Sequence, residues 1–534
     1  MKRFNYFGIS LLMAVMLFIS CSGNKSDLSV LIPKDSYVVV NMNLGKLYDK
    51  GNFKDFDKTQ LYAQVNGLLS MFQPETGKIL TELATNSKGT GIDVKGEMYG
   101  YANDNYVGIL IPIKDKSKFN DFLKRNQSAD KKEEPRKIEQ FLAVGGDNSS
   151  LVAWNDNVIY FLQGMKSQAK QQMETDLKAF AAQKKETSIE SHPFYEKFIS
   201  GKKDISVMMD LEKIYNTADA TAKATSGLGD LPLLSQVSSM MRGSYTAFYT
   251  EFNNDVVDVM VETKASDEMK KMFDYDKLYK KSMSDRLLKL IPGKAFIVAS
   301  MAVEPSEMAK GYKEMLSKIT KDNNSESSAL INTIFASFDK YINRLDGEMV
   351  FALNDITESA DMFSPSVPEF SFIIGTKDNN ILTDIVKDIP LLKIKGNYLE
   401  IPTGTEIGTL YITNANNLLY ITNNMFMTAV AVKGECEDNI TKSPYMAQLK
   451  SGMFFLMNLN FDNFPDGIKA QMSSDFVKPL ADKLNIFEAF TVENVKTGET
   501  MKGSLKLKKH NQNALLTLFQ AIEKAAGGAM AGGM

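Results

Sequence analysis

The chain has 534 residues, of which 44% are hydrophobic and 24% are charged, with 62 Lys and Arg against 65 Asp and Glu. This composition is typical of folded globular proteins and argues against disordered, collagen-like and coiled-coil chains. A net charge of −3 argues against a broad electrostatic surface for nucleic acid, which needs clustered Lys and Arg. Because a single core stops growing at roughly 300 residues, the length predicts at least two domains.

The N-terminus has the pattern of a secretory signal peptide. Lys2 and Arg3 precede an apolar run at 7–19, which has the length of a signal segment and is too short for a membrane span. We therefore expect residues 1–20 to be a signal peptide that is removed from the mature chain.

A cysteine directly follows this run, in the order Ser20-Cys21-Ser22. A small residue before a cysteine at this place resembles the lipobox of bacterial lipoproteins, in which the cysteine is acylated and becomes the first mature residue. We expect lipid on Cys21 and a lipidated tether at 21–30, because two acyl chains anchor a protein firmly. Ser22 in place of aspartate resembles outer-membrane sorting, so we expect a periplasm-facing outer-membrane protein, with exposure at the cell surface left open. The alternative for Cys21 is an ordinary signal peptide with a cysteine nearby.

Similar segments occur twice along the chain, in the same order. Leu-Ile-Pro followed by an apolar run occurs at 31–33 and again at 290–292. The other pairs are 96–98 with 347–349, 157–160 with 417–420, and 193–194 with 444–445. The sequence therefore predicts two homologous domains of about 250 residues, at 31–283 and 284–526, which is within the usual domain size. The Gly-rich end at 527–534 predicts a flexible tail.

The first half of each copy predicts strands and a helix. In the first copy a strand at 37–42 is followed by paired strands at 98–101 and 107–113. A helix at 118–124 follows, with Ser117 as its expected cap. Strands that meet mainly through hairpins, with helices between groups of strands, predict an α+β fold in which each domain has a mainly antiparallel sheet with helices packed on it.

The second half of each copy predicts a hairpin, a short helix, a strand and a closing helix. Asn155 and Asp156 stand between two apolar runs and tolerate left-handed turn geometry, so they predict the hairpin. A short helix enters at Pro193, and a strand follows at 205–209. The last helix of the chain has Asn511 as its expected cap. Its apolar face is formed by Leu515, Leu518, Phe519 and Ile522.

Residues that usually carry catalysis or bind metal are scarce. The mature chain has two histidines, of which His192 precedes a helix entry and His510 lies between a strand and a helix. No Cys-x-x-Cys or His-x-x-x-His spacing occurs, so we expect no metal site and no cofactor. Cys436 lies between Glu435 and Glu437, whose charges are expected to raise the pKa of the thiol and suppress its thiolate.

Three short motifs, at 200–203, 341–343 and 496–498, follow the order seen in penicillin-recognising serine enzymes. The repeat favours a structural interpretation, since Ser451 stands in the second copy at the place of Ser200 without the lysine that the chemistry needs. The segment at 496–498 is also expected to be the tip of a hairpin.

Four carboxylates occur at matching positions of the two copies, Glu97 with Glu348 and Asp104 with Asp355. A feature that both copies share is explained most simply by a requirement of the fold, and Asn-Asp is a common turn dipeptide. The functional alternative is a hydrolase that acts on envelope polymers through carboxylates such as Glu97 or Glu348.

Methionine and phenylalanine are abundant, at 30 and 32 residues. Thioether side chains fill irregular apolar space, so the surplus predicts core packing. The functional alternatives are a copper site and a lipid cavity that these side chains line. The one tryptophan, Trp154, gives little support to a glycan site built from stacked aromatic rings.

The lipobox, the tether and a domain that opens with Leu-Ile-Pro and occurs twice resemble a family of uncharacterised Bacteroidetes lipoproteins that carry a domain of unknown function. The resemblance covers almost the whole mature chain and implies location and architecture, with no catalytic or binding residues to transfer. We therefore predict a membrane-anchored envelope lipoprotein that is a non-catalytic binding or assembly module. Its expected partners are the membrane, through lipid on Cys21, and an envelope protein or an apolar small molecule, with no nucleic acid. The alternatives are the carboxylate hydrolase and a periplasmic carrier for lipid or another apolar ligand.

Overall fold

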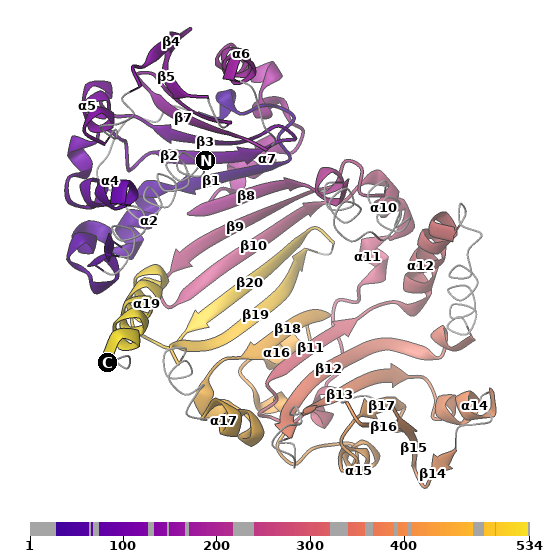
Figure 1. Ribbon diagram of the computed structural model, residues 1–534. Helices are drawn as coiled ribbons and strands as arrows, with labels where there is room; N and C mark the ends of the chain where they lie inside the picture. Colours follow the sequence, from indigo (N-terminus) through magenta and orange to yellow (C-terminus); the bar gives the residue numbers. More distant parts are fainter. Residues whose placement is uncertain are drawn as a thin grey trace. The chain divides into compact units, whose positions relative to one another are not determined.

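The computed structural model shows a chain of helices and antiparallel strands, which confirms the expected α+β fold class (Figure 1). The chain divides into two compact units: unit 1 is Met1–Ile214, Tyr245–Lys264 and Lys509–Met534, and unit 2 is Tyr215–Ser244 and Ala265–Lys508. The structure describes residues 28–63, 66–67, 74–126, 133–146, 149–165, 170–216, 240–320, 340–357, 367–388, 393–403, 407–473, 485–496 and 498–531. The expected signal peptide at 1–20 and the expected lipidation site Cys21 lie outside these residues.

Unit 1 contains an antiparallel sheet. In order across the sheet, its described strands are β10 (Val256–Lys264), β9 (Tyr245–Asn253), β8 (Ile205–Asp210), β1 (Val38–Asn43), β2 (Glu97–Ala102), β3 (Tyr106–Pro112), β7 (Val158–Gly164), β6 (Ser150–Trp154), β5 (Phe141–Gly145) and β4 (Arg136–Ile138). Side chains alternate between the two faces, as in any strand. In β1, Val39 and Asn41 are fully buried, whereas Val38 and Val40 are half-buried on the opposite face.

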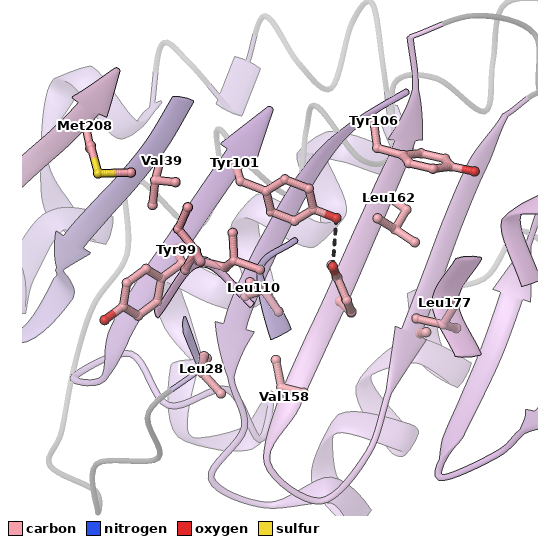
Figure 2. Packing of buried hydrophobic residues seen from close by; sticks show 14 of the residues in the cluster. Leu28, Val39, Tyr99, Tyr101, Tyr106, Leu110, Val158, Leu162, Leu177 and Met208 are labelled. Carbon is pink, nitrogen blue, oxygen red and sulfur yellow. Dashed lines mark hydrogen bonds between the residues drawn. The ribbon is translucent and has the colours of Figure 1, made fainter. Parts of the chain in front are cut away.

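Helices pack against both faces of this sheet. One buried cluster joins Met98 and Ile109 of the sheet to Phe119 of a helix. The cluster of the other face joins Tyr99 to Leu177 (Figure 2). The helices of unit 1 before its last strands are α2 (Leu44–Gly51), α4 (Pro74–Thr85), α5 (Lys116–Asn126), α6 (Lys170–Ala181) and α7 (Tyr195–Gly201), with short 3-10 helices at Ser29–Leu31, Phe53–Lys58, Ser87–Gly89, Lys185–Thr187 and Ile189–Ser191.

Two buried tyrosines form a hydrogen-bonded pair in the second cluster (Figure 2). The hydroxyls of Tyr101 and Tyr160 are 2.7 Å apart, and the Tyr160 hydroxyl donates to the backbone oxygen of Leu31 at 3.0 Å. Burial raises the pKa of both phenols well above the ordinary value, so both stay neutral. The pair therefore connects the start of the domain to the sheet through satisfied polar groups.

Unit 2 contains a second antiparallel sheet. In order across the sheet, its described strands are β20 (Thr500–Leu507), β19 (Phe487–Lys496), β18 (Met453–Asn458), β11 (Ile297–Ala302), β12 (Leu345–Thr357), β13 (Val367–Thr376), β17 (Leu418–Thr422), β16 (Thr409–Ala415), β15 (Tyr398–Pro402) and β14 (Ile394–Lys395). Its helices are α10 (Asp267–Met272), α11 (Tyr275–Leu278), α12 (Pro305–Thr320), α14 (Ile381–Asp388), α15 (Met427–Lys433), α16 (Met446–Leu449) and α17 (Asp466–Met472), with 3-10 helices at Leu288–Leu290, Ile440–Lys442 and Phe461–Asn463. A buried cluster joins Val298 and Phe454 to Ala431 of α15 and Leu449 of α16, so these helices cover one face of the sheet.

The two sheets have the same register at their central strands. Val38 of β1 faces Ala102 of β2 and Met209 of β8. Ile297 of β11 faces Leu353 of β12 and Met457 of β18. The matching segments at 96–98 and 347–349 therefore lie at equivalent positions beside β1 and β11.

The helix expected at 118–124 forms, but its expected cap is wrong. Helix α5 begins at Lys116, and the Asp115 side chain accepts a hydrogen bond from the Lys118 N–H at 3.1 Å. Ser117 lies inside the first turn. Aspartate is as good a cap as serine, and its charge also interacts favourably with the helix dipole.

The hairpin formed by β6 and β7 is confirmed, but Asn155 and Asp156 are not left-handed. The Asn155 Oδ1 atom instead accepts a hydrogen bond from the Val158 N–H at 3.1 Å, which closes the turn through the side chain. The left-handed pair occurs in the hairpin of β16 and β17, where Asn416 and Asn417 have φ of 54° and 57°.

The closing helix, α19 (Ala514–Ala531), differs from the expectation at both ends. Asn513 caps it by accepting from the Leu515 N–H at 3.0 Å, whereas Asn511 has a left-handed φ of 55° and lies outside the helix. At the other end the helix continues into the segment 527–534, which was expected to be a flexible tail. Alanine has the highest helix propensity and extends the helix past the first glycines.

The compact units also divide the chain at other positions than the expected domains. Residues 265–283 belong to unit 2, and residues 509–534, with α19, belong to unit 1. The ring of Phe519 in α19 contacts Phe53 and Phe56 at centroid distances of 5.2 and 5.4 Å, beside a buried cluster of unit 1.

Replacing Phe519 with alanine is expected to lower the free energy of unfolding of unit 1 by about 2–3 kcal/mol, because its contacts with this cluster are lost. Trp154 is buried in the same cluster, so its fluorescence during urea unfolding reports on unit 1. The matched control is Ile522→Ala on the same helix, where the side chain is 54% exposed and the change should stay within about 0.5 kcal/mol. Equal effects of the two substitutions would contradict the packing of α19 in unit 1.

Candidate functional site

The carboxylate of Glu97 is held at the start of β2. It forms an ion pair with Lys202 at 2.5 Å and accepts from the Tyr99 hydroxyl at 3.3 Å, and its side chain is 15% exposed. The amide nitrogen of Asn41 donates to the same carboxylate oxygen at 3.4 Å. These contacts join β2, β1 and the end of α7, which is a structural role.

The matching Glu348 is also engaged, with different partners. It accepts hydrogen bonds from the backbone N–H and the hydroxyl of Ser284, both at 2.6 Å, and lies 3.5 Å from the Arg286 Nε atom. Asp355 accepts from the Ile468 N–H at 3.1 Å, which caps α17, whereas Asp104 is exposed in the turn between β2 and β3. Glu97, Glu348 and Asp355 therefore serve local contacts in the fold, and Asp104 is an exposed turn residue.

His192 is half-buried at the entry of α7. Its Nδ1 atom accepts a hydrogen bond from the Phe194 N–H at 3.2 Å, and its ring contacts the Tyr245 ring at a centroid distance of 4.5 Å. Burial, together with the charges of Lys213 and Lys264, lowers the pKa of His192 to about 4. The imidazole is therefore neutral near pH 7 and closes a turn. The other histidine, His510, is exposed at the strand-to-helix junction.

The thiol of Cys436 is a poor nucleophile. Burial is the main cause that raises its pKa to about 11, followed by the charge of Asp438. The direction agrees with the expectation, but the expected cause, the flanking Glu435 and Glu437, is wrong. The thiol donates to the backbone oxygen of Leu290 at 3.3 Å. Among the described residues no group of three His, Cys, Asp or Glu side chains is arranged to bind a metal ion.

Ser200 of the penicillin-enzyme motifs and its counterpart Ser451 are helix-end residues. The Ser200 hydroxyl donates to the Lys197 backbone oxygen at 2.8 Å, and the Ser451 hydroxyl donates to the Gln448 backbone oxygen at 2.7 Å. The same contact in both units supports the structural interpretation. Gly498 has a left-handed φ of 69° in the turn between β19 and β20, and Thr497 lies outside the described residues.

Unit 2 has an apolar cavity of about 320 Å³ on the face of its sheet that α15 and α16 leave open. Because Val298 and Phe454 point into the core beneath those helices, their neighbours Ala299 and Phe455 point to the opposite face. The cavity is lined by Ala299, Ser300, Met301, Met349, Phe351, Phe372, Met453, Phe454, Phe455, Val492, Glu493, Asn494 and Met501. The lining side chains come from six neighbouring strands, so the sheet itself builds the site.

The cross-strand register arranges the apolar lining in two rows. In the first row Ala299 lies directly between Phe351 and Phe455. Its methyl group leaves space between the two larger rings, and Phe351 is 39% exposed. The second row consists of Met349, Met301 and Met453, which are direct neighbours. Unbranched thioether chains adapt to the shape of an apolar partner, so this row forms a deformable wall.

A polar side chain, Asn494, borders the apolar lining. Its neighbour across the ladder is Met501 of β20. The Asn494 Oδ1 atom is buried and has no hydrogen-bond partner among the described residues. Ser300, which also lines the cavity, donates its hydroxyl to the Leu449 backbone oxygen at 2.7 Å on the helix-covered face. Asn494 therefore contributes a free acceptor at the cavity.

The matching face of unit 1 is covered by its own helices. Met98 and Ile109 hold the register positions that Met349 and Phe372 hold in unit 2, and they are 3% and 6% exposed. In unit 1 the cluster around these residues includes Phe119 of α5. In unit 2 Met349 and Phe372 remain half-exposed among the described residues.

The cavity residues were not identified by sequence reasoning. The Met and Phe surplus was assigned to core packing, which is correct for Met173 and Met208 but incomplete for the row of Met301 and its neighbours. A usable signal is present in β18, where both alternating sets of positions are apolar although only one set faces the helices. A strand that is apolar on both faces predicts a second covered surface.

A model of the family described as "Domain of unknown function (DUF4836)" matches residues 29–515, so the chain belongs to that family. The comparison with curated proteins found no match. Two similar solved structures are titled "Structure of crystal form III of TP0453" and "Structure of crystal form IV of TP0453", at 12% and 11% identity. They cover 44% and 47% of this chain and 85% and 98% of their own, with TM-scores of 0.23 and 0.21. A likeness at these TM-scores carries no argument about function. No helix of the described residues is both long and apolar enough to cross a membrane.

The environment of His192 makes the stability of unit 1 depend on pH. Its pKa of about 4 in the folded chain lies below the ordinary 6.5, so the unfolded chain binds more protons between these values. We expect full stability above pH 6.5 and a progressive loss, about 1–2 kcal/mol after allowance for solvent screening, as the pH falls to 4. Urea unfolding followed by Trp154 fluorescence measures this loss. The loss should be smaller by that amount in His192→Asn, which keeps an acceptor near the Nδ1 position, and an unchanged loss in this variant would contradict the assignment to His192.

Proposed function

We propose that this member of the DUF4836 family is a non-catalytic binding module of the cell envelope, which holds an apolar small molecule or the acyl chain of a lipid in the cavity of unit 2. The observation that carries the proposal is the cavity itself. Its volume of about 320 Å³ lies at the lower end of the range for small-molecule sites, roughly 300–1,000 Å³. Its lining is mostly Met, Phe, Val and Ala, with few polar groups.

The chemistry of the lining favours a flexible hydrocarbon. Each methylene group that leaves water for such a site contributes about 0.8 kcal/mol. The methionine row adapts to a chain of variable shape, and the gap at Ala299 admits it between the rings of Phe351 and Phe455. A half-exposed apolar patch of this kind is uncommon on a chain that has no partner for it.

We further propose that lipid on Cys21 tethers the protein to the periplasmic side of the outer membrane. The support is the signal segment at 7–19, the small residue before Cys21 and the serine after it. A tethered binding module stays close to membrane lipids, which raises their effective concentration at the cavity.

The two units are proposed to be copies of one domain. The proposal is supported by the same order of strand pairing in both sheets and by the equal register of β1 and β11 with their neighbours. Tyr160 and Tyr420 also occupy matching places, and both hydroxyls form buried hydrogen bonds. In this view the second copy, whose described residues leave this face open, became the binding unit.

The two alternatives have less support. A hydrolase that uses Glu97 or Glu348 needs a carboxylate free to act, whereas both are engaged in the contacts described above and neither lines the cavity. An assembly role with an envelope protein would use the same apolar face, and it is distinguished by whether a small molecule competes for that face.

Replacing Ala299 with phenylalanine is expected to weaken binding of the neutral fluorescent probe N-phenylnaphthylamine at least tenfold, because the added ring fills the gap between Phe351 and Phe455. Fluorescence titration of the purified protein measures the Kd. The matched control is Val40→Phe, which adds a ring at the equivalent register position of unit 1 and should leave the Kd unchanged. Equal Kd values for the two variants would overturn the proposed site, and circular dichroism checks that both are folded.

Replacing Cys21 with alanine is expected to move the protein from the membrane fraction to the periplasmic fraction, because the acyl chains supply the anchor. Native mass spectrometry of protein extracted mildly from its own envelope should show the mass of the lipid on the wild-type chain and no such mass on the variant. An unmodified Cys21 in the wild-type chain would contradict the tether and would leave the cavity proposal to its own test.

A further inference from the structure

We propose that the unit 2 cavity binds a single-chain amphiphile whose head group donates a hydrogen bond to the Oδ1 atom of Asn494. This inference rests on the proposed function, since it names the chemical class of the ligand that the same cavity takes. The inference depends on two neighbouring features. The Oδ1 atom of Asn494 is a buried acceptor for which no described residue supplies a donor, and it lies beside an apolar lining.

Asn494 supplies an unsatisfied hydrogen-bond acceptor at the cavity. The Asn494 Oδ1 atom is buried and has no partner among the described residues, and its neighbour across the ladder is the apolar Met501. A buried acceptor that lacks a donor is unfavourable, so a ligand that supplies the donor gains more than it would in water. Other buried acceptors without a partner, such as those of Asn41 and Asn354, are not among the residues that line this cavity.

The polar neighbours of Asn494 restrict the head group. The hydroxyl of Ser300 is committed to the Leu449 backbone oxygen, so it does not compete for Oδ1. Glu493 precedes Asn494 in β19 and lies opposite Phe454, whose side chain is in the helix-covered core, so the Glu493 side chain points away from the cavity. An ionised carboxylate head group has no hydrogen to donate, so it would leave the Asn494 Oδ1 atom unsatisfied. The geometry therefore favours a neutral or cationic donor, such as a hydroxyl, an amide or an ammonium group.

The remaining lining restricts the rest of the molecule. From Met501 and Val492 the cavity continues over β18, β11 and β12 to Phe372, with apolar side chains in both rows. A volume of about 320 Å³ accommodates one hydrocarbon chain and not the two chains of a membrane phospholipid. The ligand class is thus a medium-length chain with a small donor at one end.

The test compares ligands that differ in one donor. On the purified full-length protein, 1-decanol, decyl methyl ether and decanoate are titrated as competitors of N-phenylnaphthylamine. The expected order is decanol tighter than the ether by about three- to tenfold, which is the worth of one hydrogen bond, and decanoate weaker than decanol. Equal affinities of alcohol and ether in the wild-type protein would overturn the inference and leave the cavity proposal standing, whereas displacement by none of the three would overturn both.

Two variants test whether Asn494 accepts the hydrogen bond from the head group of the ligand. Asn494→Leu keeps the approximate shape of the side chain and removes the acceptor, so the alcohol-to-ether ratio should fall to about one while the ether binds as well as before or more tightly. Met501→Leu changes the neighbouring apolar side chain and should keep the ratio. A ratio that survives in Asn494→Leu would show that another group accepts the hydrogen bond and would overturn the assignment to Asn494.

Discussion

The alternation of side chains along the central strands determines what each sheet can do. In β11 the even-numbered Val298, Ser300 and Ala302 point into a core that helices cover, so Ala299 and Met301 are forced to the opposite face. The apolar side chains of that second face are shielded from water only if other residues or a ligand cover them. Unit 1 uses helices for this purpose, and the described part of unit 2 presents a cavity bordered by methionine and phenylalanine. The proposed binding site is therefore a property of the sheet face, to which six strands contribute.

Sequence reasoning succeeded where local patterns dominate and failed where tertiary contacts decide. The strands around 37–42 and 205–209, the helix α5 and the hairpin around Asn155 follow from alternation and turn residues. The caps at Asp115 and Asn513 were missed by two residues because several polar side chains near a helix start can all serve. The membership of α19 in unit 1 depends on Phe519 meeting Phe53, which no local pattern encodes. The cavity was missed for the same reason, since it arises from rows of residues on different strands.

The hydrogen-bond partners of the polar groups distinguish structural residues from candidate binding residues in this chain. The carboxylates of Glu97 and Glu348, the imidazole of His192 and the thiol of Cys436 each have a partner or a pKa that suits a structural role. Groups that are satisfied in this way stabilise the fold and offer little to a substrate. The informative group is the one that the fold leaves unsatisfied beside an apolar space, and Asn494 is such a group. Asn494 is a candidate binding residue because of its surroundings and not because of its residue type.

The assignment of residues 509–534 to unit 1 has a consequence for the order of assembly. Phe519 completes the apolar cluster around Phe53 and Phe56, so these two residues can finish their packing only after Phe519 has been synthesised. In a chain that emerges N-terminus first, both segments of unit 2, Tyr215–Ser244 and Ala265–Lys508, are synthesised before Phe519, so unit 2 can complete its core before unit 1 does. Until Phe519 is in place, the rings of Phe53 and Phe56 remain open to premature association with other chains. Unit 1 begins first in the sequence and is thus the last to complete its apolar core.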